Sequence, residues 1–281
     1  MAEKLGNRRV TGDEQFYTPA NLALELTEFA LSKIPNWQER SFLEPAAGTG
    51  SFLGALQDLG AKKIKAIDKY PKHPDVLERD YLDFVPDETG LITISNPPFG
   101  RNNALSIPFF NHAANHSDFI GFLVPRSWRK WSVQNRLDPR FRLVADLDVF
   151  VSYEDEFGVT LAAKNELRTC FQLWQKVDQL RAPMHIPDNG FVSKTSPEDS
   201  DVAIRVFGFG CGNVLWDYPK TKNTTLMFLK IHDKLAGELL SQLDYQRFTK
   251  NTAYTEALAF TELNFLLNER ILGHGMAQKD G

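Results

Sequence analysis

The sequence predicts an α/β protein in which a doubly wound, mostly parallel sheet is followed by a small α+β appendage. Three observations predict it. From Ser41 onward, short apolar runs alternate with helical stretches, a pattern typical of βαβ units. The first of these runs ends in an acidic residue and a glycine-rich turn. After Arg181 the chain changes to a stretch rich in Pro, Asp, Ser and Gly, which indicates a linker.

The elements are expected in the following order. A helix over residues 19–33 has Thr18 as its N-cap and Pro19 at its first position. Seven strands follow at 41–45, 63–68, 76–78, 91–95, 119–124, 143–149 and 170–174. They define a doubly wound domain over residues 1–181. In the appendage, residues 182–281, we expect a linker at 182–200, strands at 201–207 and 225–229, and helices at 233–243 and 254–270.

The composition is that of an intracellular globular protein. No apolar stretch approaches the roughly 20 residues that span a bilayer, so we expect no membrane association and a cytoplasmic location. The two cysteines, Cys170 and Cys211, have neither disulfide nor metal spacing. His112 and His116 stand four residues apart without a third ligand nearby, so we interpret them as surface or packing residues and predict no metal site.

Charge is unevenly distributed along the chain. The net charge is −4, yet residues 101–142 hold seven Lys or Arg and two Asp, a local balance of +5 that leaves −9 elsewhere. A basic segment on an acidic protein can concentrate phosphate binding on one face. The alternative, a solvated surface without a partner, stays open.

The segment from Glu44 to Leu53, EPAAGTGSFL, predicts a cofactor-binding turn. Glycines at 48 and 50 let a ligand approach the backbone, and a helix starting near Ser51 offers free N–H donors. The next strand ends at Asp68, where a carboxylate can accept both hydroxyls of a ribose. A dinucleotide site competes, but Leu53 stands at its third glycine position, and Glu44 would repel a pyrophosphate while favouring a cationic amino group. A purely structural turn is the remaining alternative.

The segment Leu91–Gly100, LITISNPPFG, is a more specific signal. An apolar strand brings Asn96 to the carboxyl edge of the sheet, where open α/β sheets bind ligands. Pro97 and Pro98 fix the direction of the carbonyls before them, and Phe99 supplies a stacking face. The Asn96 side-chain oxygen and the Pro97 carbonyl can hold both protons of an exocyclic amino group, which makes its nitrogen more nucleophilic.

These motifs resemble those of the amino-group DNA methyltransferases. Ser95–Phe99 is similar to their catalytic motif, and Glu44–Leu53 is similar to their cofactor motif. The segment QFYTP, residues 15–19, resembles the one that precedes the cofactor motif in the gamma-type order and closes over the methionine moiety. The resemblance covers about residues 14–181.

The resemblance implies a class I methyltransferase: a Rossmann-like, seven-stranded sheet with a reversed last strand near residues 170–174, S-adenosylmethionine as cofactor, and N6 of adenine in DNA as target, with the base flipped out of the duplex. It assigns catalysis to Asn96, Pro97, Pro98 and Phe99. It assigns cofactor binding to Tyr17, Thr18, Glu44, Pro45, Ala46, Gly48, Gly50, Asp68, Asp80, Tyr81 and Asn96.

The basic segment is then expected to hold nucleic acid. Arg101 and Asn102 follow the catalytic motif. Further along the chain, four basic residues are placed to bind phosphates: Arg126, Arg129, Lys130 and Arg136. Trp128 and Trp131 lie among them and are equally interpretable as core residues. Methylation of RNA adenine, of cytosine N4 or of a protein glutamine amide are alternatives, as is a catalytically silent binding module. The recognition sequence, a restriction endonuclease partner and the oligomeric state are left open.

Overall fold

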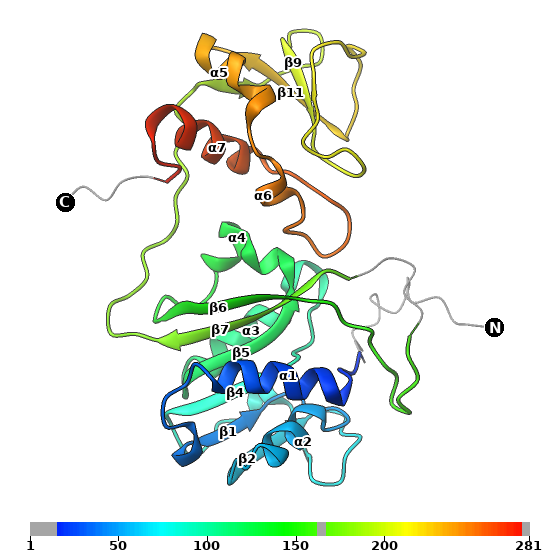
Figure 1. The fold of residues 1–281 in the computed structure, drawn as a ribbon, viewed down its shortest axis with the longest axis vertical. Helices are drawn as coiled ribbons and strands as arrows, with labels where there is room; N and C mark the ends of the chain where they lie inside the picture. Colours follow the sequence, from blue (N-terminus) through cyan, green and yellow to red (C-terminus); the bar gives the residue numbers. More distant parts are fainter. Residues whose placement is uncertain (1–15, 162–166, 277–281) are drawn as a thin grey trace. The chain divides into compact units, whose positions relative to one another are not determined.

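The computed structural model describes residues 16–161 and 167–276 and divides the chain into two compact units (Figure 1). Of the described residues, the N-terminal unit holds 16–128, 132–161 and 167–182, and the C-terminal unit holds 129–131 and 183–276. Among the residues that are described, no helix has the length and apolar character needed to cross a membrane. Gln15, the first residue of the predicted QFYTP segment, lies outside the described residues.

The N-terminal unit is built on the predicted seven-stranded sheet. The strand order is β3-β2-β1-β4-β5-β7-β6, in which the first five strands are parallel and β7 runs antiparallel to both β5 and β6. This is the strand order that the resemblance implies, with the reversed strand at the predicted place. The strands are β1 (Ser41–Glu44), β2 (Lys63–Asp68), β3 (Leu77–Glu78), β4 (Leu91–Ser95), β5 (Ser117–Pro125), β6 (Phe141–Val149) and β7 (Thr169–Lys176).

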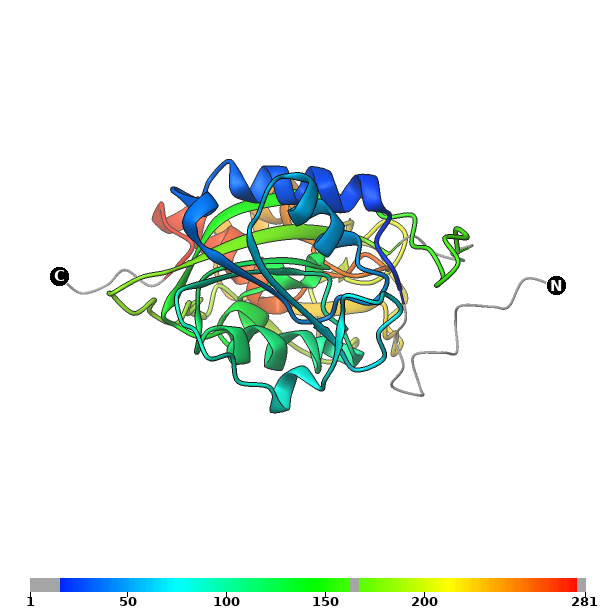
Figure 2. The same ribbon diagram turned by 90° about the horizontal axis from the view of Figure 1, so that it is seen from below.

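Helices cover both faces of this sheet, as Figure 2 shows for α1 and α3. Successive side chains of β5 point to opposite faces of the sheet, and both faces are apolar. Ile120, Phe122 and Val124 belong to the core cluster on the side of α3, whereas Phe119 and Leu123 belong to the cluster on the side of α1 and α2. The helices are α1 (Ala20–Leu31), α2 (Ser51–Asp58), α3 (Ser106–Ala113) and α4 (Trp131–Gln134), with 3-10 turns η2 (Trp37–Glu39), η3 (Tyr81–Asp83), η4 (Arg101–Asn103) and η5 (Arg126–Arg129).

The C-terminal unit has its own antiparallel sheet and core. The strand order is β10-β9-β11-β8. Trp131, although it lies between β5 and β6 in the sequence, packs against the rings of Phe248 and Phe265 at 5.3 and 5.0 Å. The elements are β8 (Val192–Lys194), β9 (Val202–Arg205), β10 (Val214–Leu215), β11 (Leu226–Ile231), α5 (Lys234–Leu239), η6 (Leu240–Gln242), α6 (Gln246–Thr249) and α7 (Phe260–Leu272).

Three expectations about elements are corrected. The first helix begins at Ala20 with Pro19 as N-cap, and the Thr18 side chain is buried rather than capping. The predicted linker 182–200 contains β8, which pairs with β11. The predicted helix 254–270 begins only at Phe260, because Ala257 forms an isolated bridge with Phe207 and holds this part of the chain extended.

Candidate active site

Three adjacent strands deliver the two predicted motifs to one edge of the sheet. β2, β1 and β4 are neighbours, and their carboxyl ends lie at Asp68, Glu44 and Ser95. The chain segments that follow these ends, together with residues 16–18, line a cavity of about 250 Å³. The cavity therefore stands at the carboxyl edge of the sheet, where open α/β folds bind their ligands.

The glycine-rich turn forms one wall of this cavity. Gly48 has φ +48°, and the ring of Tyr17 lies so close that an added Cβ would stand 2.6 Å from its Cε1. The Gly48 N–H donates to Asp68 Oδ2 at 2.8 Å, while Asp68 Oδ1 accepts from the Tyr70 N–H at 2.7 Å. Each carboxylate oxygen of Asp68 thus holds one backbone donor, and each still has a lone pair for a ligand hydroxyl.

Glu44 ends β1 in a fully enclosed position. Its side chain is 1 % exposed, and Oε2 has no hydrogen-bond partner among the described residues. Burial raises the pKa of Glu44 well above its usual range; a hydrogen bond from the Leu53 backbone N–H opposes this, and the Asp68 carboxylate adds to it. A buried carboxyl group of this kind is stabilised in its ionised form by a cationic ligand group.

Asn96 is fixed in orientation by the segment ahead of α1. Its Nδ2 donates to the Phe16 backbone carbonyl at 3.1 Å, and since a carbonyl only accepts, this contact assigns the amide nitrogen to that side. The other atom of the amide, Oδ1, is buried and has no partner among the described residues. A hydrogen-bond acceptor is therefore presented by the cavity wall beside Pro97 and Phe99.

An aromatic cluster supports the opposite, apolar wall. Tyr81 is 2 % exposed, packs against Phe109 at 5.0 Å, and is hydrogen-bonded through its hydroxyl to Nε2 of His116 at 3.1 Å. Burial lowers the pKa of His116 to about 4, with the neighbouring His112 adding to the effect. Both histidines pack as the sequence indicates, and no cluster of metal-ligating side chains exists among the described residues.

The cavity brings together most residues that the sequence assigned to catalysis and cofactor binding. Gly50 is the exception: it is the N-cap of α2, and an added Cβ there would meet His73 at 3.0 Å. The predicted residues that line the cavity are Tyr17, Thr18, Glu44, Pro45, Ala46, Gly48, Asp68, Asp80, Tyr81, Asn96, Pro97, Pro98 and Phe99.

Sequence reasoning missed several lining residues. Leu105 and Phe109 form part of the apolar wall, and their signal was the apolar face of the helix that follows the catalytic motif. Ser95 Oγ is buried without a partner among the described residues. The other missed lining residues are Phe16, Ala47, Thr49, Ser51, Phe52, Lys69, Tyr70 and Leu82, which lie within or beside the motifs in sequence.

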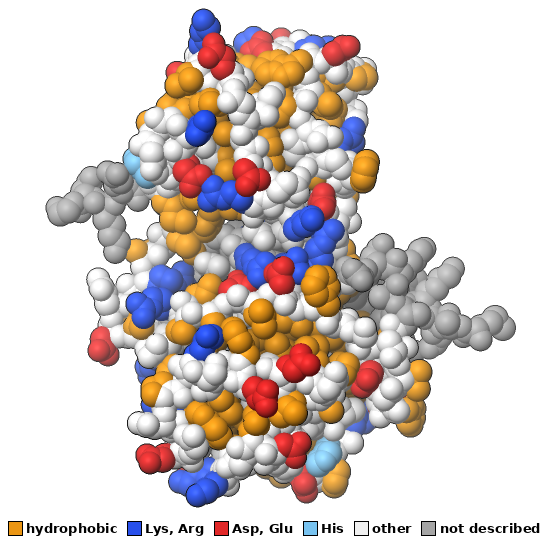
Figure 3. All heavy atoms as spheres, viewed as in Figure 1, with side chains coloured by type: hydrophobic (Ala, Val, Ile, Leu, Met, Phe, Trp, Pro, Cys, Tyr) orange, Lys and Arg blue, Asp and Glu red, His pale blue; other side chains and the backbone are white. Residues whose placement is uncertain are grey.

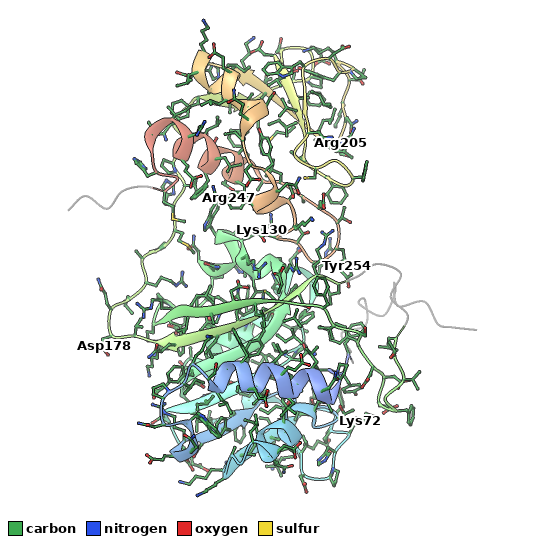
Figure 4. All side chains as sticks on the ribbon, in the orientation of Figure 1. Lys72, Lys130, Asp178, Arg205, Arg247 and Tyr254 are labelled. Carbon is green, nitrogen blue, oxygen red and sulfur yellow. The ribbon has the colours of Figure 1, made fainter. Side chains whose placement is uncertain are left out.

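The structure does not bring the residues predicted to bind nucleic acid to the cavity: none of Arg101, Asn102, Arg126, Arg129, Lys130 and Arg136 lines it. Arg126 is only 7 % exposed; it pairs with Asp148 at 3.0 Å and donates to the Thr169 carbonyl, so the expectation that it binds phosphate is corrected. Lys130, labelled in Figure 4, forms an ion pair with Glu262 inside the C-terminal unit, so its charge also has a partner within the protein.

Other members of the basic set remain at the surface. Arg101, Asn102 and Arg136 are exposed, and Arg129 is partly exposed. Trp128 is fully buried and donates from its indole to Ser106 Oγ at 3.2 Å, which settles it as core. On the face of the N-terminal unit seen in Figure 3, acidic and apolar side chains lie over α1 and α2, and neither helix carries a Lys or Arg.

Comparison with known proteins adds little. No protein-family model and no curated protein sequence matches this chain. Among solved structures it is similar to one from Pyrococcus horikoshii described as a putative RNA methyltransferase, with 21 % identity, 63 % of this chain and 93 % of that chain covered, and a TM-score of 0.48.

Two further likenesses are weaker. One is to the M protein of the type I restriction enzyme EcoKI, at 16 % identity over 58 % of this chain and 44 % of that chain, with a TM-score of 0.40. The other is to the 23S rRNA methyltransferase ErmE, at 13 % identity over 59 % and 72 %, with a TM-score of 0.41. At such low likeness the activity of this chain has to be argued from its own residues.

Proposed function

We propose that this chain is an S-adenosylmethionine-dependent methyltransferase that methylates N6 of adenine in DNA. One observation carries the proposal: the Asn96 amide is oriented by Phe16, so that its buried Oδ1 is left as an acceptor in the wall of the cavity. A buried acceptor without a donor is costly, and a ligand N–H offsets that cost. The exocyclic amino group of a nucleobase supplies such a donor.

Unpartnered polar atoms also support the cofactor. Besides Asn96, the buried atoms without a partner among the described residues include Thr18 Oγ1 and Glu44 Oε2, and both residues line the same cavity. The methionine end of S-adenosylmethionine carries an ammonium and a carboxylate group, which fit Glu44 and the Thr18 hydroxyl respectively. Asp68 would hold the ribose hydroxyls, and the aromatic wall at Tyr81 would hold the adenine.

The protein groups then account for the chemistry. S-adenosylmethionine, when bound, supplies an electrophilic methyl group. Asn96 Oδ1 and the Pro97 carbonyl accept the two protons of the target amino group, which localises the lone pair on its nitrogen. The same two acceptors stabilise the positive charge that develops on that nitrogen during transfer. Phe99 stacks on the base. Because Phe99 is only 6 % exposed, this contact keeps water from one face of the base.

The choice of adenine in DNA rests on narrower grounds. The combination of Asn96 and Phe99 with a Tyr-Thr-Pro segment, residues 17–19, resembles the adenine-specific enzymes. The exposed Arg101 and Arg136 favour a polyanionic substrate over a protein. We assign recognition of the target sequence to the appendage, residues 182–281, nearly all of which lies in the C-terminal unit, because the N-terminal unit is largely occupied by the sheet and the cavity.

A panel of acceptors tests this proposal. The protein is incubated with labelled S-adenosylmethionine and, separately, with duplex DNA, RNA and a protein mixture, and the DNA and RNA are digested for nucleoside mass spectrometry. We expect label in DNA as N6-methyladenine. Label that appears as N4-methylcytosine, or only in RNA or in protein glutamine, would show that the substrate named in this proposal is wrong. Absence of label with every acceptor, together with absence of cofactor binding, would refute it.

A further inference from the structure

The segment of the loop after β6 that spans residues 153–161, here called the arm, is folded as a small hairpin. Its turn is organised by Asp155, whose Oδ1 accepts from the backbone N–H groups of Phe157 and Val159 at 2.9 Å each. The Asp155 N–H donates to the Val159 carbonyl, and the Leu161 N–H donates to the Tyr153 carbonyl at 2.7 Å. The arm is therefore a hairpin held by its own internal hydrogen bonds.

The arm pairs with the segment that bears Tyr17. The Tyr17 N–H donates to the Glu154 carbonyl at 3.1 Å, and the Glu154 N–H returns a bond to the Tyr17 carbonyl at 3.0 Å. The rings of Phe16 and Tyr153 pack at 5.6 Å. Since Phe16 also accepts from Asn96, and Tyr17 covers Gly48, the arm supports both motifs of the cavity through these two residues.

A side-chain ion pair fastens the arm to the other side of the cavity. Lys72 Nζ lies 2.6 Å from Glu156 Oε2, and the two side chains are 33 % and 37 % exposed. Figure 4 shows Lys72 on the loop after β2, and the N–H of Lys72 donates to the Gly48 carbonyl at 2.9 Å. The contacts close a ring that runs from Gly48 to Tyr17, Glu154, Glu156, Lys72 and back to Gly48.

The Glu156 carboxylate also affects the titration of Tyr17. The pKa of Tyr17 is raised to about 12, mainly by burial, with further contributions from the carboxylates of Asp68 and Glu156. The Glu156 carboxylate thus interacts electrostatically with Tyr17 and forms an ion pair with the ammonium of Lys72. With the ion pair broken, the arm keeps its two backbone bonds to Tyr17 but loses its attachment to the loop after β2.

We propose that Lys72 and Glu156 are positioning residues whose ion pair holds Tyr17 against Gly48 and so slows the release of ligand from the cavity. The part that concerns the ligand rests on the proposed function. The part that concerns the arm does not, because the ring of contacts is formed by the protein alone. Residues 16–18 form a wall of the cavity, and a ligand held there leaves faster when that wall is free to move.

The first measurement is hydrogen exchange at the amides of Tyr17 and Glu154 in the ligand-free protein. We expect Lys72→Ala and Glu156→Ala each to accelerate this exchange by about twofold to fivefold, the range for an ion pair of this exposure. The double variant should exchange no faster than either single one, and the charge exchange Lys72→Glu with Glu156→Lys should restore protection. Lys65→Ala, which breaks the exposed pair with Asp87, is the matched control and should leave exchange unchanged.

The second measurement is the dissociation rate of S-adenosylmethionine, and of its demethylated product, from the same variants. We expect an increase of the same size in the single variants and wild-type rates in the charge exchange and in Lys65→Ala. Unchanged exchange in both single variants, or additive effects in the double variant, overturns the proposal. Faster exchange in a protein that binds neither compound leaves the attachment of the arm standing and refutes the proposed function instead.

Discussion

The ring of Tyr17 covers Gly48 so closely that no side chain fits between them: an added Cβ would stand 2.6 Å from Cε1 and 2.8 Å from Cδ1 of the ring. Gly48 also adopts φ +48°, a conformation that disfavours side chains. The N–H of Gly48 is held by Asp68 and its carbonyl by Lys72. One glycine therefore fixes the spacing between the cofactor turn and the segment that closes over it.

Gly48→Ala is expected to weaken binding of S-adenosylmethionine at least tenfold, because the added methyl group displaces Tyr17. The left-handed backbone adds a stability cost of about 1–2 kcal/mol. Calorimetry and thermal unfolding measure the two effects. Gly54→Ala is the matched control, since it lies within α2 with nothing within 4 Å of the added Cβ, and it should bind normally. Normal binding by Gly48→Ala would remove the Tyr17 contact from the site.

The buried carboxyl group of Glu44 predicts a pH dependence of binding. Its pKa is raised by burial in the free protein, and a cationic ligand stabilises the ionised form, so that binding releases a proton. Affinity for S-adenosylmethionine should therefore rise with pH from the ordinary carboxyl pKa up to the raised one and then level off. Calorimetry in buffers of different ionisation enthalpy detects the proton. Glu44→Gln should bind more weakly and without proton release.

The same group predicts the stability of the free protein. A carboxyl group whose pKa is raised on folding contributes stability below its unfolded pKa and loses it as pH rises through the folded value. Glu44→Gln should therefore unfold a few degrees above wild type at pH 8, the shift that ~1 kcal/mol gives a domain of this size, and nearer to it at pH 4. A variant that is less stable at pH 8 but binds normally would contradict the assigned role.

Removal of the C-terminal unit tests where the target sequence is read. A chain ending at Ala182 retains the sheet and the cavity, but Trp131 loses the rings of Phe248 and Phe265 against which it packs. Trp131→Ser is therefore added to the shortened chain. We expect wild-type affinity for S-adenosylmethionine and loss of preference among DNA sites, mapped by sequencing of methylated DNA. Methylation of the same sites by the shortened chain would place recognition in the N-terminal unit.

The sequence predicted the sheet well because its strands are short runs rich in apolar residues; the central strand β4 is buried along its whole length. β2 and β4 begin and end where predicted, at Lys63–Asp68 and Leu91–Ser95. The strand at residues 170–174 was predicted from its residues, whereas the reversed direction of β7 was predicted from the resemblance. In the C-terminal unit, β8 was missed because a three-residue strand in a polar, Pro- and Gly-rich stretch has no pattern of its own. It exists through its pairing with β11.

The cavity was predictable where local motifs carry it and not where distant segments meet. Glu44, Asp68 and Asn96 each end or follow a strand, so topology brings them together. The arm was not predictable, because Glu154 meets Tyr17 across more than a hundred residues. For Arg126 the prediction failed because the partner of a charged side chain cannot be read from the sequence. Its charge suggested a phosphate contact, whereas in the structure it forms an ion pair with Asp148 on β6.

The most direct test of the account is the single-turnover methylation rate of Asn96→Ala on DNA. The substitution removes the acceptor Oδ1, and the loss should resemble that of one oxyanion-hole donor, on the order of 10²–10³ in rate. Cofactor affinity should stay near wild type, because the proposed ammonium, ribose and adenine contacts lie at other residues. Asn21→Ala, an exposed position on α1, is the control and should retain the full rate. A wild-type rate of N6-methyladenine formation by Asn96→Ala would contradict the mechanism.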